Sequence, residues 1–168
     1  MHVRSFGSRI SLSALAVATI LLLAGCEPKD RRPGLWLSGE PVEEMPSDWT
    51  FIAEHPEIFV ETRPWYGVPF SVTTVIGTRN GKLYVPSIYA EEAAFPGTKY
   101  WNSVIAENPD VRLKIGDRLY EMRAVPVQDI AEFREGAGAL ADKYDSWAGW
   151  LEDESTAPHF VIIRMDPR

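Results

Sequence analysis

Cysteine is almost absent from this sequence of 168 residues, which contains only Cys26. A single cysteine excludes a disulfide within the chain and a zinc site built from several thiolates. Histidine is nearly as rare, and only His55 and His159 lie beyond the first 26 residues. Neither has a cysteine or a second histidine at the spacing that metal sites use. We therefore expect no metal site and a fold that is stabilised by packing alone.

The sequence also lacks an apolar run long enough to cross a bilayer as a helix. Its longest apolar stretch, residues 10–23, has 14 residues and is interrupted by three hydroxyl side chains. Arg4 and Arg9 precede it. A membrane-spanning helix needs about 20 apolar residues. A basic start followed by a short apolar segment is typical of an export signal. Residues 1–25 are therefore predicted to be a signal peptide.

Cys26 follows this segment directly, in the sequence Leu23-Ala24-Gly25-Cys26. These four residues resemble the lipobox of bacterial lipoproteins, in which the chain is cut before the cysteine and acyl chains such as palmitate are attached. The resemblance implies lipidation of Cys26 and a lipid-anchored place in the cell envelope, on the outer membrane where the cell has two membranes. Each buried methylene adds about 0.8 kcal/mol of membrane affinity, and two acyl chains give a stable anchor. An ordinary secretory signal with an incidental cysteine is the alternative.

Basic residues are outnumbered by acidic ones, 17 to 24. Removal of Arg4 and Arg9 with the signal leaves 15 basic residues, and hence a formal charge of −9 for the 143 residues from Cys26 onward. Such a charge repels nucleic acids and anionic headgroups, so we expect no nucleic-acid partner and no electrostatic binding to a membrane. The length is sufficient for one domain with its own core.

The segment after Cys26 is rich in proline and charge. Residues 27–47 contain four prolines and a charged run at residues 29–32, a composition that favours extended chain and cannot bury a core. Residues 26–47 are therefore predicted to be the lipidated cysteine with a flexible tether, and residues 48–168 the folded domain. The apolar triplet Leu-Trp-Leu at residues 35–37 is expected to fold back onto the domain, with contact to the membrane surface or a partner as the alternative.

Short strands dominate the predicted domain. Asn80-Gly81 accepts the positive φ angles of a tight turn and predicts a hairpin around it. Alternating apolar and charged residues at 111–115 predict a strand with one buried face, which returns through Gly116-Asp117. Six strands are expected in all, at residues 57–62, 70–78, 82–88, 111–115, 118–127 and 159–165.

Helices are expected between these strands. A short turn is predicted at residues 48–54 and a short crossover helix at residues 100–107. Apolar residues spaced three and four apart over residues 128–152 form one stripe, which predicts a single long C-terminal helix. Gly136 and Gly138 weaken this helix by about 1 kcal/mol each, and a break there is the alternative. The predicted class is α+β, mainly β, built as a small antiparallel barrel.

The middle of the sequence resembles a known family. The stretch 71–127, with its hairpin on Asn80-Gly81 and the run WNSVIAENPDVRLKIG at residues 101–116, is similar to the FMN-binding split β-barrels. That family includes pyridoxamine-phosphate-oxidase-like proteins and deazaflavin-dependent nitroreductases. The resemblance extends over about residues 48–168. It implies a six-stranded antiparallel split β-barrel, FMN or a deazaflavin as cofactor in a homodimer cleft, and a small-molecule substrate.

The resemblance also implies which residues hold the cofactor. In that family the cofactor phosphate lies near the start of the short helix and the ring lies against the first hairpin. The matching positions are Ser71, Thr73, Thr74, Pro86, Ser87, Gly97, Thr98, Lys99, Tyr100 and Trp101. Amide groups at a helix N-terminus attract an anion, and a lysine can complete a phosphate site. No catalytic residue is predicted, which is typical of chemistry that a cofactor performs.

Two positions depart from the family pattern. Tyr100 and Trp101 stand where an oxidase carries a basic pair, and Val104 stands where the deazaflavin relatives often have asparagine. Both departures weaken phosphate binding, and Lys99 has the alternative of being a solvated loop lysine. Six aromatic residues have two possible roles: they line a pocket for a flat cofactor ring, or they pack in the core. They are Trp65, Tyr66, Tyr89, Phe95, Tyr100 and Trp101.

Three functional hypotheses follow from the sequence. The leading one is a membrane-anchored, flavin- or deazaflavin-dependent oxidoreductase, similar to nitroreductases or quinone reductases. The first alternative is a cofactor-less module for binding or assembly in the envelope, because reduced nicotinamide donors are scarce outside the cytoplasm. The second alternative is haem binding on the same barrel, with His55 or His159 as axial ligand. An absorption spectrum of the purified protein distinguishes the three.

Overall fold

The computed structural model describes residues 34–89, 94–97 and 99–168, so Cys26 and Thr98 lie outside the described residues. The described strands form one antiparallel sheet in the order β3-β2-β6-β7-β8-β5-β4, with β1 added in parallel beside the start of β7. Their bounds are β1 Glu40–Pro41, β2 Ile58–Thr62, β3 Phe70–Thr74, β4 Gly77–Arg79, β5 Lys82–Tyr89, β6 Asp110–Ile115, β7 Arg118–Pro126 and β8 His159–Pro167.

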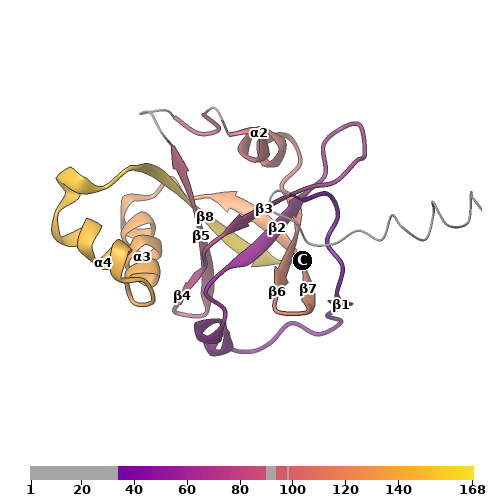
Figure 1. The fold of residues 1–168 in the computed structure, drawn as a ribbon, viewed down its shortest axis with the longest axis horizontal. Helices are drawn as coiled ribbons and strands as arrows, with labels where there is room; N and C mark the ends of the chain where they lie inside the picture. Colours follow the sequence, from indigo (N-terminus) through magenta and orange to yellow (C-terminus); the bar gives the residue numbers. More distant parts are fainter. Residues whose placement is uncertain (1–33, 90–93, 98) are drawn as a thin grey trace, which may run out of the picture.

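The sheet curls into a half-barrel, so that β3 and β5 approach each other although four strands lie between them in the strand order (Figure 1). The hydroxyl of Thr74 on β3 donates to the carbonyl of Pro86 on β5 at 3.3 Å, which joins the two strands. The α+β class and the antiparallel barrel are as expected from the sequence. This junction between β3 and β5 also sets the position of the candidate site described below.

The described strands number eight, so the prediction of six was wrong. One addition is β1, and the other arises because the predicted strand at residues 70–78 is divided into β3 and β4. The chain turns at Val75 and Ile76, since β3 pairs with β2 while β4 pairs with β5. The predicted tight turn is confirmed, because Asn80 and Gly81 have φ angles of 51° and 75°. A type of backbone that favours asparagine and glycine therefore joins β4 to β5.

The stretch before residue 48 contacts the barrel at three places. Gly34 and Ser71 exchange two backbone hydrogen bonds of 3.1 Å, and β1 lies beside β7. Between them, the Leu37 amide donates to the buried Glu61 carboxylate at 2.6 Å, and the Leu37 side chain is 4% exposed. Residues 34–47, which composition assigned to a flexible tether, thus lie in part against the sheet. Within the apolar triplet, only Leu37 is buried.

The helices cover two sides of the sheet. Helix α2 (Tyr100–Glu107) crosses over between β5 and β6, with the bounds expected from the sequence. Helices α3 (Ile130–Ala141) and α4 (Asp145–Glu152) lie together at one end of the molecule (Figure 1). Two short 3-10 helices, η1 (Thr50–Glu54) and η2 (Glu154–Thr156), complete the described helices. None of the helices in the described part of the chain is long and apolar enough to span a bilayer.

The single C-terminal helix expected over residues 128–152 is divided into α3 and α4, which corrects that prediction. The break lies at residues 142–144 because Lys143 is held against the barrel, where its ammonium group donates to the carbonyls of Ile52, His55 and Ile76 at 2.7, 2.6 and 3.3 Å. Burial lowers the pKa of Lys143 to about 8. The next residue, Tyr144, donates from its hydroxyl to the Pro56 carbonyl at 3.0 Å.

The two glycines of α3 do not break the helix. Gly136 is buried against β5 and β8, where an added Cβ would lie 2.6 Å from Ile162 and 2.9 Å from the Tyr84 ring. Gly138 faces the Arg79 guanidinium in the same way. The glycines therefore allow the helix to approach the sheet closely. Beneath α3 and α4 lies a small apolar cluster around Leu140 and Trp147, separate from the main core inside the barrel.

Candidate functional site

A cavity of about 640 Å³ lies where β3, β5 and the start of α2 meet. Its volume is in the range that suits a small ligand or cofactor. Most of the residues predicted to hold a cofactor line it, namely Thr73, Thr74, Pro86, Ser87, Lys99, Tyr100 and Trp101. The remaining walls are apolar and come from Phe70, Val72, Val75 and Ile88. We call this cavity the β3–β5 groove.

Two of the predicted residues, Ser71 and Gly97, do not line the groove, and a third is outside the described residues. Ser71 is 1% exposed, and its backbone pairs with Gly34 on the edge of β3. Gly97 has a φ angle of 61°, and a side chain there would meet the ring of Tyr89. Thr98 is outside the described residues. The lipidation site predicted at Cys26 is outside them as well.

A buried polar cluster adjoins the groove through Ser87 and is centred on Asn102, which is fully buried in the first turn of α2. Its amide nitrogen donates to the Ser87 hydroxyl at 3.0 Å, to the Tyr89 hydroxyl at 2.6 Å and to the Pro96 carbonyl at 3.2 Å. The Tyr89 hydroxyl also donates to the Pro96 carbonyl at 3.2 Å. Burial raises the pKa of Tyr89, so this hydroxyl remains a donor at neutral pH.

The wall formed by β3 contains a buried hydroxyl, that of Thr73. The Thr73 hydroxyl is buried and makes no hydrogen bond to any described residue. Leaving a buried polar atom without a partner costs about 1 to 3 kcal/mol, so such atoms are often completed by a ligand or an ordered water. Thr73 lines the groove, and a bound molecule or ordered water that reached this buried hydroxyl would supply the missing hydrogen bond.

The entrance to the groove is formed by the first residues of α2. Lys99 is the residue before the helix, its side chain is exposed, and its carbonyl accepts the amides of Asn102 and Ser103 at 3.1 and 3.2 Å. The amides of Tyr100 and Trp101 belong to the first turn, which has no earlier helical carbonyls to bind. A free helix N-terminus with an adjacent ammonium group favours an anion.

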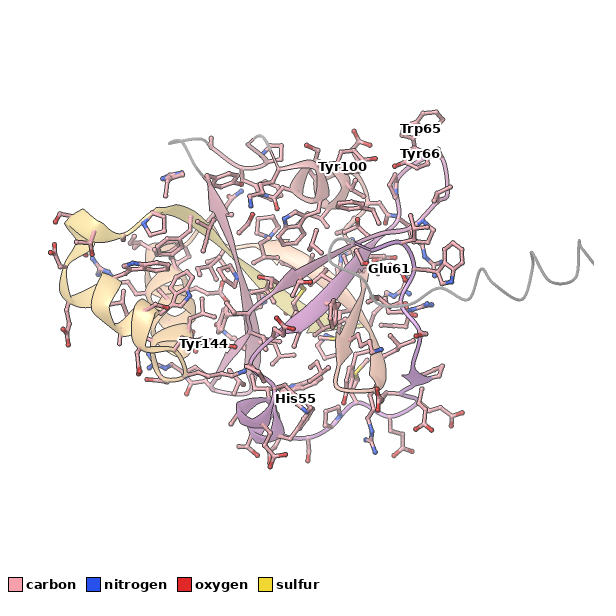
Figure 2. All side chains as sticks on the ribbon, viewed as in Figure 1. His55, Glu61, Trp65, Tyr66, Tyr100 and Tyr144 are labelled. Carbon is pink, nitrogen blue, oxygen red and sulfur yellow. The ribbon has the colours of Figure 1, made fainter. Side chains whose placement is uncertain are left out.

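Aromatic rings form one rim of the groove. Tyr100 packs edge-to-face on Phe70 with ring centroids 5.5 Å apart, and its hydroxyl lies 2.7 Å from that of Tyr66 (Figure 2). The hydrogen bond to Tyr66 raises the pKa of Tyr100 to about 12. Of the aromatic group identified in the sequence, Tyr100 and Trp101 line the groove and Tyr89 belongs to the polar cluster around Asn102. Phe95 packs on the main core, while Trp65 and Tyr66 project on the loop between β2 and β3.

The two histidines line other cavities, although the His159 ring packs on that of Tyr89 with centroids 5.6 Å apart. His159 lines an aromatic cavity of about 960 Å³ between α3, α4 and β8, and His55 lines one of about 570 Å³ near Gly116 and Tyr120. Within residues 34–89, 94–97 and 99–168, no three His, Cys, Asp or Glu side chains are grouped so that they could hold a metal ion.

Asn102 is the site residue that the sequence did not identify. The signal was present, because Asn102 lies one turn before Ile105 on a short helix whose buried face also carries Trp101 and Val104. A polar residue on an apolar helix face must find hydrogen-bond partners when it is buried. Its partners come from β5 and from Pro96, and neither contact could be read from local sequence.

No known protein family and no curated protein matches this sequence. Among solved structures, HutZ, the heme storage protein of Vibrio cholerae, is 14% identical, with 70% of this chain and 85% of that chain covered and a TM-score of 0.53. The conserved hypothetical protein Rv2991 of Mycobacterium tuberculosis is 13% identical, with 77% and 86% covered and a TM-score of 0.52.

A third similar structure is a candidate 5-nitroimidazole antibiotic resistance protein from Bacteroides thetaiotaomicron. It is 13% identical, with 84% of this chain and 92% of that chain covered and a TM-score of 0.50. Identities this low show a shared fold and do not transfer a ligand or an activity. The fold of this chain is the split β-barrel.

Proposed function

We propose that this protein binds a flavin-type cofactor, FMN or a deazaflavin, in the β3–β5 groove and acts as an oxidoreductase. The observation that carries the proposal is the convergence of an unpartnered buried hydroxyl, a helix N-terminus and a lysine on one cavity of about 640 Å³. A flat ring suits the groove because its walls are aromatic and aliphatic, and aromatic side chains pack favourably against such rings. A homodimer, which the family resemblance implies, is part of the same proposal.

The residues of the groove have separate roles in this proposal. Lys99 and the first amides of α2 bind the anionic part of the cofactor, and Thr73 and Ser87 donate or accept hydrogen bonds along the ring. Asn102 fixes Ser87 from below, which keeps its hydroxyl oriented. The bound cofactor supplies the hydride chemistry, while the protein orients the ring and excludes water.

We also propose that the protein is a lipoprotein of the cell envelope, anchored through acyl chains on Cys26. The support is the Leu23-Ala24-Gly25-Cys26 sequence after a short apolar segment. The test is the mass of the N-terminal peptide of the protein purified from bacterial membranes. A peptide that begins at Cys26 and carries acyl chains agrees with the proposal, and an unmodified cysteine contradicts it.

An absorption spectrum and a thermal unfolding curve test the cofactor proposal. The purified protein should show a flavin or deazaflavin band, or its thermal midpoint should rise when FMN or a deazaflavin cofactor is added, because a ligand that binds only the folded state stabilises it. A colourless protein whose midpoint does not move with either cofactor would rule the proposal out. That result would favour the cofactor-less binding module.

Replacing Lys99 with alanine is expected to weaken FMN binding about tenfold, since a charge-assisted hydrogen bond contributes about 1.5 kcal/mol or more. Calorimetric or fluorescence titration measures the dissociation constant. Lys82→Ala is the matched control. Lys82 is also exposed, but it lies on the β4–β5 hairpin away from the groove, where it pairs with Glu132 and Glu135 of α3. Equal weakening in both variants would mean that the effect comes from overall charge and not from the groove.

Haem binding is a second candidate, favoured by one observation. His159 lies on the wall of the 960 Å³ cavity together with Phe133, Trp147, Phe160 and Arg134. An imidazole can serve as an axial ligand to haem iron, aromatic rings can pack on the macrocycle, and a guanidinium can bind a propionate. Titration with hemin decides the matter, because a Soret band should appear if the site forms and should be absent if it does not.

A further inference from the structure

Large apolar side chains are exposed on two segments next to the edge strand β3. In the loop between β2 and β3, Trp65 is 89% exposed, and Tyr66 and Val68 are each about half exposed. Among the first described residues, Leu35 is 51% and Trp36 39% exposed. An almost fully exposed tryptophan is rare on the surface of a soluble protein, and a group of exposed apolar side chains is typical of an interaction site.

The two segments lie side by side in the fold. Gly34 exchanges backbone hydrogen bonds with Ser71, which directly follows Phe70 at the start of β3, and the loop ends at that strand. Figure 1 shows both segments at the end of the molecule opposite α3 and α4. The exposed apolar residues of these two neighbouring segments, which we call the aromatic edge, are Leu35, Trp36, Trp65, Tyr66 and Val68.

The loop holds its tryptophan outward. Its turn is closed by a 2.9 Å hydrogen bond from the Gly67 amide to the Pro64 carbonyl, with Gly67 at a φ angle of 81°. The Tyr66 hydroxyl is tied to that of Tyr100, and the Trp65 and Tyr66 rings meet edge-to-face with centroids 5.6 Å apart. Figure 2 shows Trp65 at the tip of the loop, pointing away from the barrel.

The chain that enters this edge is short if it is anchored at Cys26. Eight residues lead from Cys26 to Gly34. Even fully extended, they span at most about 29 Å. A linker this short keeps the aromatic edge within about one small domain diameter of the bilayer. It also turns toward the bilayer the side of the domain at which the chain enters.

We infer that the aromatic edge docks on the phospholipid surface to which Cys26 is anchored. This inference rests on the lipid anchoring proposed above. Tryptophan and tyrosine prefer the boundary between headgroups and acyl chains, where an amphipathic ring is apolar on one side and hydrated on the other. Because the formal net charge of the chain from Cys26 onward is −9, docking depends on apolar contact and does not require anionic lipid.

Quenching of tryptophan fluorescence by brominated acyl chains tests the docking. The full chain is expressed with its own signal, purified from membranes and reconstituted in phosphatidylcholine vesicles with and without bromine. Brominated vesicles should quench the emission equally at low and high salt, and Trp65→Phe should remove roughly half or more of that quenching if Trp65 reaches the boundary. Trp150→Phe, which alters a tryptophan in the cavity beside α4, should leave the quenching unchanged.

The outcomes separate this inference from the anchoring on which it rests. The mass of the N-terminal peptide is measured on the same sample. A sample without lipid on Cys26 overturns the anchoring and the docking together. A lipidated sample whose quenching is absent, or is the same in Trp65→Phe, overturns the docking alone. Shielding of Trp65 in a dimer formed in detergent, with no quenching in vesicles, would assign the aromatic edge to a second copy of the chain and also overturn it.

Discussion

Replacing Gly77 with alanine is expected to lower the free energy of unfolding by about 3 kcal/mol. Gly77 begins β4 and faces the backbone of α3, where an added Cβ would lie 2.5 Å from the carbonyl of Ala139 and 2.8 Å from the amide nitrogen of Leu140. Helix backbone cannot rotate aside as a flexible side chain can, so α3 would have to move away from β4. Urea unfolding followed by tryptophan fluorescence measures the loss.

Gly149→Ala is the matched control for this prediction. Gly149 lies in α4, and an added Cβ there has no atom within 4 Å. Alanine is favoured over glycine inside a helix by about 1 kcal/mol, so this variant should be as stable as the parent or more stable. If both variants lost the same stability, contact with α3 would not be the cause at Gly77.

The order of local elements could be predicted from the sequence where one signal decides the structure. Asn80-Gly81 forms the tight turn because those residue types tolerate positive φ angles. Residues 100–107 form α2 as expected, and the alternating pattern in β6 buries Val111, Leu113 and Ile115. The turn, the short helix and the alternating strand each depend on residues that are close together in the sequence, so the sequence alone is enough to predict them.

The sequence misled where distant contacts decide the structure. The apolar stripe over residues 128–152 continues across the break at residues 142–144, and only the carbonyls around Lys143, which come from residues 52, 55 and 76, explain why the helix stops. The division of β3 from β4 likewise depends on which strand each one pairs with. The burial of Leu37 agrees with the expected fold-back of its triplet, but the partner of its amide, Glu61, lies 24 positions away and could not be read from the sequence.

The family resemblance predicted which residues line the candidate site. It did not predict the hydrogen bonds that these residues make or lack. The resemblance named the residues at the ends of β3 and β5 and at the start of α2, and the fold brings seven of them around one groove. It could not show that the Thr73 hydroxyl lacks a protein partner, or that Asn102 supports Ser87 from below. Both features depend on burial, which only the assembled barrel creates.

Replacing Asn102 with leucine is expected to lower the free energy of unfolding by about 3 kcal/mol, because unmet buried hydrogen-bonding groups cost about 1 to 3 kcal/mol each. Leucine matches the amide in size but removes the donor to Ser87 and Tyr89. Binding of FMN should weaken in the same variant, because Ser87 loses the contact that orients it in the groove. Urea unfolding and an FMN titration measure the two effects.

Asn108→Leu controls for the loss of an asparagine at the other end of α2. Asn108 is exposed and donates to the Arg63 carbonyl at 3.3 Å, so its replacement should cost less than about 1 kcal/mol. FMN binding should stay unchanged, since Asn108 does not line the groove. Equal losses at Asn102 and Asn108 would show that burial of the amide is not what matters.

Asn102→Asp tests whether the cluster requires a donor. At neutral pH an aspartate has the shape of asparagine but only acceptor atoms, and burial disfavours its charge, so its pKa in the folded protein should rise above its unfolded value of about 3.9. The folded state then binds more protons than the unfolded state between these two pKa values. Stability of this variant should therefore fall as pH rises through that window and recover in acid, relative to the parent protein. A variant as stable as the parent at neutral pH would show that the amide nitrogen of Asn102 is not needed beneath the groove.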